Sequence, residues 1–233
     1  MTDSNTEIAA LREALRSAET RHAEDSERIR RLEQDLQEVR QEARHSMRNI
    51  LSVVRSIARR SVASARSIEE YRQYMDGRIG AFARVQSAIS RHPGRGVDLG
   101  SLVADELVSF GVRLDGQATI EGEAIRLRDK PAGLLGLAFH ELVVNSLTFG
   151  ALAAEGQLHI TWRRQAEGPA SDLWIQWAEN RVAPGALSRQ PKRGFGSQVL
   201  EEAVAYELAG STQIDLSEKG LVCSIRLPAS CLA

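Results

Sequence analysis

Apolar residues recur every three or four positions along the first third of the chain. Over residues 8–43 they form one seam that polar residues interrupt only at His22 and Asp25. The apolar members are Ile8, Leu11, Leu15, Ala18, Ile29, Leu32, Leu36, Val39 and Ala43. The same phase continues to Ile57, and no glycine or proline occurs before Gly77. The pattern predicts one helix from about residue 6 to about residue 60, with a two-chain coiled coil over residues 5–44.

A second helical pattern follows a short break. The small and polar residues from Ser61 to Ser67 predict a turn, with Ser67 as the N-cap of the next helix. An apolar stripe then runs at helical spacing up to the His92-Pro93-Gly94 stop. Its members are Tyr71, Met75, Ile79, Phe82, Val85 and Ile89. We therefore expect a helical hairpin over residues 45–95, and two copies of it would form a dimeric four-helix bundle.

Residues 96–233 show a mixed pattern of helices and strands. A helix is expected over Asp98–Val112, and a nearly all-apolar helix opens at Pro131. Residues 197–208 have a third helical pattern. The expected strands form three pairs: 118–122 with 125–127, 157–164 with 172–178, and 212–216 with 221–227. An irregular stretch after Glu179 is long enough for a lid. The predicted fold class is α+β, a sandwich with a largely antiparallel sheet.

Composition excludes several classes of function. The 30 Lys and Arg residues balance 31 Asp and Glu residues, so the formal charge of −1 provides no basic field for nucleic acid. The two cysteines, Cys223 and Cys231, offer neither a disulfide framework nor metal-ligand spacing. No signal peptide is evident, and no apolar run approaches the length of a membrane span. These features predict a cytoplasmic protein without membrane insertion.

The segment His140-Glu141-Leu142-Val143-Val144-Asn145 carries the first candidate chemistry. It resembles a zinc-protease motif only superficially, because Asn145 replaces the second histidine, and zinc is therefore excluded. Glu141 and Asn145 lie four residues apart on one helical face. The amide oxygen could bind Mg²⁺ on phosphates and the carboxylate could accept a proton. A hydrogen-bonded core pair is the alternative that spacing leaves open.

Two further segments carry candidate residues. Gly194-Phe195-Gly196 precedes a predicted helix and could expose backbone N–H groups to phosphates, although a simple loop-to-helix turn fits the same residues. His45 lies on the long N-terminal helix at the edge of the seam, where its ring would be accessible while its backbone is held. The remaining histidines His22, His92 and His159 have ordinary structural interpretations at a seam, a helix end and a strand surface.

Four blocks in this order resemble bacterial sensor histidine kinases of the HWE subfamily, over about residues 40 to 228. The phosphoacceptor block is matched by His45-Ser46-Met47-Arg48-Asn49. The histidine-containing N box is matched by residues 140–145. The Trp-x-Glu block is matched by Trp177-Ala178-Glu179, and the Gly-Phe-Gly-Ser block by residues 194–197. The resemblance implies a Bergerat-type ATP-binding domain over residues 96–233.

The resemblance also implies roles for single residues. His45 would attack the γ-phosphate of ATP, and Glu141 would lie near the reacting phosphate. Asn145 would hold Mg²⁺, and Asn49 would position water when a response regulator is dephosphorylated. The other nucleotide-binding residues would be His140, Trp177, Glu179 at the adenine amino group, and Gly194 and Gly196 at the phosphates and lid.

The sequence departs from the family pattern in ways that bear on ATP binding. Asn180-Arg181-Val182-Ala183-Pro184 replaces a Gly-Gly-Pro turn, and Thr148 replaces a lysine of the N box. Backbone that must approach a nucleotide closely has thus lost its glycines. Two hypotheses follow. The first is an ATP-dependent histidine kinase that passes phosphate to a response regulator receiver domain. The second is a histidine phosphotransferase or phosphatase scaffold whose degenerate domain no longer binds ATP.

The sequence also suggests how a signal would arrive. Residues 5–44 are the predicted signalling helix, and an upstream sensory partner could grip them. A third hypothesis, in which only the coiled coil functions, predicts that His45→Ala changes nothing in the cell. The expected cofactors are ATP and Mg²⁺, and the expected assembly is a homodimer.

Overall fold

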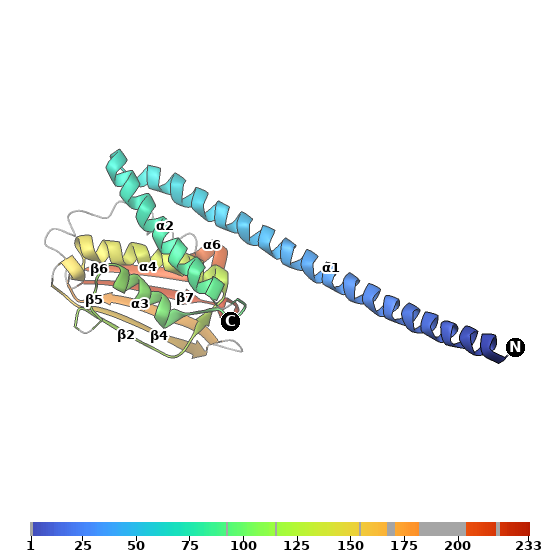
Figure 1. The fold of residues 1–233 in the computed structure, drawn as a ribbon. Coiled ribbons are helices and arrows are strands. Elements are labelled where there is room, and N and C mark those ends of the chain that lie inside the picture. The colour runs from blue at the N-terminus through green and yellow to red at the C-terminus, as the bar shows by residue number, and fades with distance from the viewer. Residues whose placement is uncertain are drawn as a thin grey trace. The chain divides into compact units, whose positions relative to one another are not determined.

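The computed structural model describes residues 2–91, 93–114, 116–153, 155–166, 171–181, 204–217 and 220–233. The chain divides into two compact units, Met1–Ser56 and Ile57–Ala233. The first unit is part of one helix, α1 (Thr2–Ser64), and the predicted continuous helix is confirmed (Figure 1). Its apolar seam is exposed in the single chain at Leu15, Ile29, Leu32, Leu36 and Val39. Pairing of this seam with a second copy stays a prediction.

The connection to the second helix is shorter than predicted. Helix α1 continues through Ser61 to Ser64, and α2 (Ile68–Arg91) begins after only three residues. The Ser67 hydroxyl accepts a hydrogen bond from the Glu70 N–H over 3.1 Å. The Glu70 carboxylate in turn accepts one from the Arg66 N–H over 2.7 Å. These two bonds satisfy free N–H groups at the start of α2, so Ser67 is the N-cap as predicted.

Helix α2 packs against α4 (Asp129–Phe149) with a face that differs from the predicted stripe. Phe82 and Val85 are buried, as expected. Ile79, however, is exposed, and the neighbouring Arg78 is buried in its place. The prediction was wrong at Ile79 because apolar spacing cannot anticipate an arginine that finds a buried carboxylate.

A short strand and a helix follow α2 and lead to the main sheet. Strand β1 (Val97–Asp98) leads into α3 (Leu99–Ser109), and the Asp98 carboxylate caps this helix by accepting a hydrogen bond from the Ser101 N–H over 2.8 Å. Strand β3 (Arg126–Leu127) pairs with β1. The predicted pairing of segment 118–122 with segment 125–127 is therefore wrong. Local alternation identified both strands but not their partners, which lie far away in the sequence.

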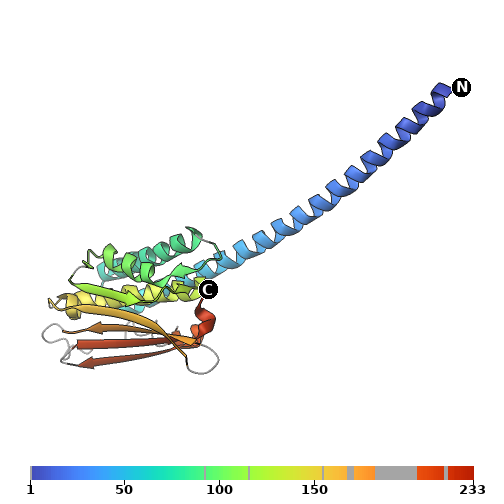
Figure 2. The same ribbon diagram turned by 90° about the horizontal axis from the view of Figure 1, so that it is seen from below.

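The main sheet has five strands in the order β2-β4-β5-β7-β6. They are β2 (Ala118–Gly122), β4 (Leu158–Ala166), β5 (Ser171–Glu179), β6 (Ser211–Ser217) and β7 (Gly220–Leu227). Strands β2 and β4 are parallel, and the other pairs are antiparallel. The two predicted antiparallel pairs β4–β5 and β6–β7 are confirmed. With α2, α3 and α4 on one face of the sheet, the α+β class is confirmed as well (Figure 2).

The core lies between this sheet and the helices. Alternate residues of neighbouring strands face it in register, so that Ile160 lies opposite Trp177 and Ile175 lies opposite Ile225. The residues between them along each strand, such as His159, point to the other face of the sheet and are exposed, as predicted. Two 3-10 turns, η1 (Ala151–Ala153) and η3 (Ala229–Cys231), and helix α6 (Val204–Leu208) complete the described elements. The part of the predicted third helix before Val204 lies outside the described residues.

Helix α4 contradicts the expectation that no apolar run approaches the length of a membrane span. Together with η1 it is long and apolar enough to cross a membrane, and it is the only candidate for a span in the described part of the chain. More than half of that segment is buried inside the protein. Contacts with α2 and α3 on one side and the sheet on the other account for its apolar composition.

Candidate active site

The predicted phosphoacceptor block lies on an exposed stretch of α1. His45 and Asn49 are one helical turn apart, and the Asn49 amide Nδ2 lies 3.2 Å from His45 Nδ1. Nitrogen and oxygen of an amide exchange places when the group is turned over. Asn49 can therefore donate to Nδ1 or accept a hydrogen bond from a protonated Nδ1. In the second arrangement the lone pair of Nε2 is free to act as a nucleophile.

The N box lies near the C-terminal end of α4, and its residues differ in exposure. His140 and Glu141 are buried, with 4% and 8% of their surfaces exposed. Asn145, one turn further on, is exposed. The sequence left open whether Glu141 and Asn145 form a hydrogen-bonded core pair. An exposed Asn145 is not part of the core, so that alternative is wrong.

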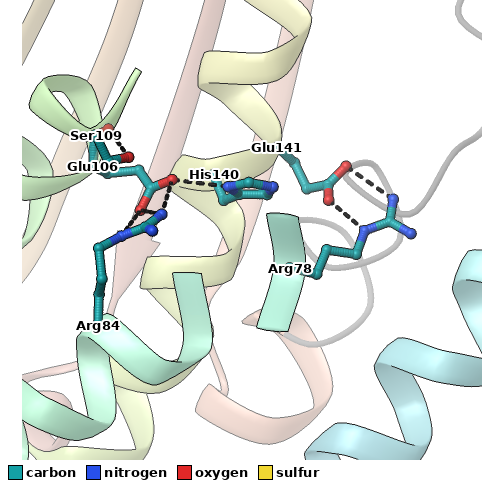
Figure 3. Close-up of polar contacts among 6 residues, drawn as sticks. All are labelled: Arg78, Arg84, Glu106, Ser109, His140 and Glu141. Carbon is teal, nitrogen blue, oxygen red and sulfur yellow. Dashed lines mark hydrogen bonds and ion pairs between the residues drawn. The ribbon is translucent and has the colours of Figure 1, made fainter. Parts of the chain in front are cut away.

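Glu141 is paired instead with an arginine of α2. Arg78 Nε donates to Glu141 Oε1 over 2.7 Å, and Arg78 Nη2 donates to Oε2 over 3.3 Å (Figure 3). Arg78 Nη1 donates to the Ser61 hydroxyl over 2.8 Å. All three residues are buried. Fork-shaped pairs of this kind are directional, so the position of the Glu141 carboxylate depends on α2.

His140 belongs to a second buried polar cluster beside the first. Its Nδ1 lies 2.8 Å from Glu106 Oε1, and Arg84 Nη2 donates to both Glu106 oxygens over 2.8 and 2.7 Å. Burial by itself would raise the pKa of Glu106. The hydrogen bonds from His140 and Arg84, together with their charges, outweigh burial and hold the pKa of Glu106 below its usual value. The cluster therefore ties α2 and α3 to the N box through an ionised carboxylate.

The Trp-x-Glu block forms a hydrogen-bonded unit at the end of β5. Trp177 and Glu179 point to the same face of the strand, and the Trp177 indole Nε1 donates to Glu179 Oε1 over 2.9 Å. The other oxygen, Oε2, accepts the backbone N–H of Ala151 over 2.6 Å. Gly150, the residue after α4, leaves no space for a Cβ beside this carboxylate. Glu179 thus joins the end of β5 to the end of the N-box helix.

Asn180, which stands where the family pattern has a glycine, makes two hydrogen bonds to Gln157. The Asn180 side chain accepts a hydrogen bond from the Gln157 N–H over 2.7 Å, and the Asn180 N–H donates to the Gln157 carbonyl over 3.2 Å. Asn180 therefore fastens the end of β5 to the start of β4. The predicted phosphate-binding residues Gly194 and Gly196 lie outside the described residues, as do residues 182–184 of the altered turn.

Sequence reasoning missed the arginines and the acid that hold the N box, Arg78, Arg84 and Glu106. A signal for Arg78 was present, because it falls at helical spacing from Phe82 and Val85 on the apolar face of α2. A charge on such a face indicates a buried partner. Its partner Glu141 is 63 residues away in the sequence, beyond the reach of periodicity.

One cleft in the described part of the chain lies between α2 and α3. It has a volume of about 300 Å³, and its polar lining includes Arg84, Arg91, Asp105, Glu106 and Arg126. None of the residues predicted for nucleotide binding lines it. The cleft is therefore a separate feature and does not mark the site formed by the N box and the Trp-x-Glu block.

Comparison with known proteins shows which family the chain resembles. Residues 42–124 match the family model described as HWE histidine kinase. The chain is 26% identical over 192 residues to a blue-light-activated histidine kinase of Brucella ovis, a match that covers 82% of this chain and 39% of that protein. It is 29% identical over 204 residues to a protein of the same name from Rhizobium johnstonii, covering 87% and 56%. The chain thus spans less than two thirds of the length of these relatives.

Solved structures show the same fold. The histidine kinase domain of the Erythrobacter litoralis blue-light-activated histidine kinase aligns with a TM-score of 0.51 at 15% identity, covering 67% of this chain and 75% of that one. A longer structure of that protein aligns with a TM-score of 0.58 at 13% identity, covering 80% and 59%. The matched family model and the two curated relatives agree with one another: the chain is similar to histidine kinases, and its residues 42–124 are similar to the HWE histidine kinase family.

Proposed function

We propose that the chain is an ATP-dependent protein histidine kinase that phosphorylates itself on His45 and passes the phosphoryl group to an aspartate of a response regulator. In this proposal residues 5–44 form the signalling helix, residues 45–95 the dimerisation and phosphotransfer hairpin, and residues 96–233 the ATP-binding domain. The match to the HWE histidine kinase model and the similarity to a curated histidine kinase support a kinase in general. The particular roles rest on the geometry of the described residues.

One observation carries the proposal, the junction between the N-box helix and the Trp-x-Glu strand. Glu179 Oε2 accepts the Ala151 N–H, and Glu179 Oε1 accepts the indole N–H of Trp177. Residues that the family resemblance assigns to a nucleotide, although far apart in the sequence, thus lie on elements joined by hydrogen bonds. The buried carboxylate keeps lone pairs for a further donor. In the proposal that donor is the amino group of adenine.

Asn145 suits a metal ion that arrives with the nucleotide. Its exposed amide offers one oxygen, whereas Mg²⁺ takes six oxygen ligands. Phosphate oxygens and water would supply the others. Glu141 lies one turn earlier on α4 and would orient or accept a proton near the reacting phosphate. Gly194 and Gly196 are proposed at the phosphates, and His140 within the nucleotide-binding set, on the sequence resemblance.

In the proposed reaction, a ring nitrogen of neutral His45 attacks the γ-phosphorus of ATP. A nitrogen–phosphorus bond forms, the bond from the γ-phosphorus to the bridging oxygen breaks, and ADP leaves with that electron pair. The ring proton passes to a base, for which Glu141 is the proposed acceptor. Asn49 lies 3.2 Å from His45 Nδ1 and can orient the ring for attack through Nε2. In a separate phosphatase reaction, Asn49 would position water for dephosphorylating the response regulator.

The proposed assembly is a cytoplasmic homodimer. The exposed apolar seam of α1, which includes Leu32, Leu36 and Val39, supports pairing of two copies. An upstream sensory partner or domain would act on the same helix. A mass measurement of the purified protein that gave a monomer at micromolar concentration would contradict the dimer.

The scaffold hypothesis loses its main support in this fold. It rested on the loss of glycines after Glu179. The Asn180 side chain instead makes a hydrogen bond to Gln157 that a glycine could not make. Asn180, the first residue of the altered turn, therefore has a structural role that does not require a domain unable to bind ATP.

The direct test of nucleotide use is calorimetric titration with a non-hydrolysable ATP analogue, with and without Mg²⁺. We expect the wild type to bind, and we expect Asn145→Ala to weaken Mg²⁺-dependent binding by about tenfold or more, since it removes a ligand of the metal. Gln176→Ala is the matched control, because Gln176 is exposed on the opposite face of β5 from Trp177. Absence of binding by the wild type, or equal binding by Asn145→Ala, would contradict the proposal.

A further inference from the structure

Helix α2 is docked closely on the N-box helix. At Gly77 the approach is so close that an added Cβ would lie 2.9 Å from His140 Nε2. At the next point of contact Val85 packs against Gly136 of α4, where again no Cβ fits. Both glycines are needed for this contact. Docking of α2 on α4 is therefore a specific feature of this sequence.

Within this contact, Arg78 forms an ion pair with Glu141, the carboxylate that the proposed kinase reaction requires. Each oxygen of Glu141 accepts a hydrogen bond from the guanidinium group. The Glu141 side chain is 10% exposed and that of Arg78 is 4% exposed, so water scarcely competes for the pair. A carboxylate acts on a substrate only if an oxygen can be presented to it. The lone pairs that remain on the two Glu141 oxygens lie within this buried contact, so docked α2 restricts what can reach them.

We infer that Arg78 is a latch, which holds Glu141 in an ion pair while α2 is docked and must release it before Glu141 can act beside a nucleotide. The inference rests on the proposed function, because only that proposal places Glu141 at the reacting phosphate. It adds a resting state in which the N box and α2 restrain each other.

The third member of the contact connects the latch to the signalling helix. Ser61 is fully buried in the last turns of α1, and its hydroxyl accepts the Arg78 Nη1–H. Ser61 belongs to the same continuous helix as His45. A rotation or shift of the end of α1 would weaken the bond between Ser61 and Arg78. The geometry thus provides a route by which a signal on α1 changes the availability of Glu141.

The latch can be tested in the wild-type protein, because binding of a nucleotide and docking of α2 must influence each other. If the undocked form is the one that uses a nucleotide, a nucleotide must in turn favour undocking of α2. Hydrogen–deuterium exchange of the wild type with a non-hydrolysable ATP analogue and Mg²⁺ measures this directly. We expect exchange in segment 71–85 of α2 to increase when the analogue binds. Unchanged or reduced exchange in that segment with analogue bound would overturn the latch.

Two variants test the latch by activity. Arg78→Gln removes the ion pair, and we expect initial labelling by γ-labelled ATP to rise about fivefold or more, within the range of measured couplings between sites. Ser61→Ala removes only the hydroxyl, disturbs the fold less and should give a smaller increase. Arg72→Gln is the control, since Arg72 is an exposed residue of α2 and loses the same charge. Rates are compared per folded molecule, measured by circular dichroism.

The outcomes separate the latch from the proposed function. Increased labelling of both variants, with Arg72→Gln at the wild-type rate, supports the latch. Binding of the analogue only by Arg78→Gln supports it as well. A wild type that binds and is labelled, together with variants that are labelled no faster, overturns the latch alone. Absence of binding and labelling in the wild type and in both variants overturns the latch and the proposed function together.

Discussion

Helix α2 carries two glycines, three residues apart, whose surroundings differ. A Cβ on Gly77 would lie 2.9 Å from His140 Nε2 and 3.1 Å from its Cε1. The His140 ring has little freedom to retreat, because it is buried and its Nδ1 bonds to Glu106 over 2.8 Å. A Cβ on Gly80 would meet only Arg84 Nη1, at 3.5 Å, which is an ordinary contact. Gly77→Ala and Gly80→Ala therefore form a matched pair.

The expected difference follows from two opposing terms. Alanine stabilises a helix interior by about 1 kcal/mol relative to glycine, and both variants gain this term. Only Gly77→Ala is also destabilised by overpacking, by about 1–3 kcal/mol. Gly80→Ala should thus be more stable than Gly77→Ala by about 1–3 kcal/mol. For a protein of this size the melting temperatures should differ by at least about 2 °C.

Thermal unfolding followed by circular dichroism at 222 nm, with urea unfolding as a second method, measures the difference. The wild type should melt below Gly80→Ala. If Gly77→Ala proved as stable as Gly80→Ala, α2 would not be packed against His140, and the close docking described above would be refuted.

Three other predictions test separate parts of the fold. Trp177→Phe removes a donor from the buried Glu179 carboxylate and should lower the free energy of unfolding by about 1.5–3 kcal/mol in urea titrations, whereas Trp174→Phe should cost far less because the Trp174 indole N–H has no partner in the described structure. Folding lowers the pKa of Glu106, so the ionised Glu106 carboxylate stabilises the protein fully above its unfolded pKa of about 4.5. This stabilisation is lost as the pH falls through the lower native pKa. Glu106→Gln should therefore lose less stability than the wild type between about pH 5 and pH 3. Burial raises the pKa of the Cys223 thiol to about 12, so the native protein should not react with Ellman's reagent at Cys223 at pH 8 and should react after unfolding, and fast reaction in the native state would contradict its burial.

Local patterns in the sequence predicted the elements well. The unbroken heptad phase gave α1, and strict alternation gave β4, β5 and the β6–β7 pair. The cap at Ser67 was predictable because the side chain that makes it is adjacent in sequence. These features depend on residues within one or two turns of each other, which is the range over which periodicity and capping act.

Contacts between distant residues were not predictable. Strand β2 pairs in parallel with β4 across some forty residues, as in the register of Ala118 with Leu158, and alternation is silent about such partners. The ion pair between Arg78 and Glu141 likewise joins residues that are 63 positions apart in the sequence. A charged residue on an apolar face shows that a partner exists, but only the fold shows which carboxylate it is. The roles of the predicted site residues therefore stay predictions, and the sequence did not reveal the contacts of His140 and Glu141 with Glu106 and Arg78.

Transfer of phosphate from ATP to His45 is the central claim and is best measured directly. The purified chain is incubated with γ-labelled ATP and Mg²⁺, and the retained label is tested for acid lability. His45→Ala is compared with His22→Ala, which removes another exposed histidine of the same helix. We predict acid-labile label on the wild type and on His22→Ala, and none on His45→Ala. Label that persists in His45→Ala, or a wild type that binds ATP without becoming labelled, would contradict the account.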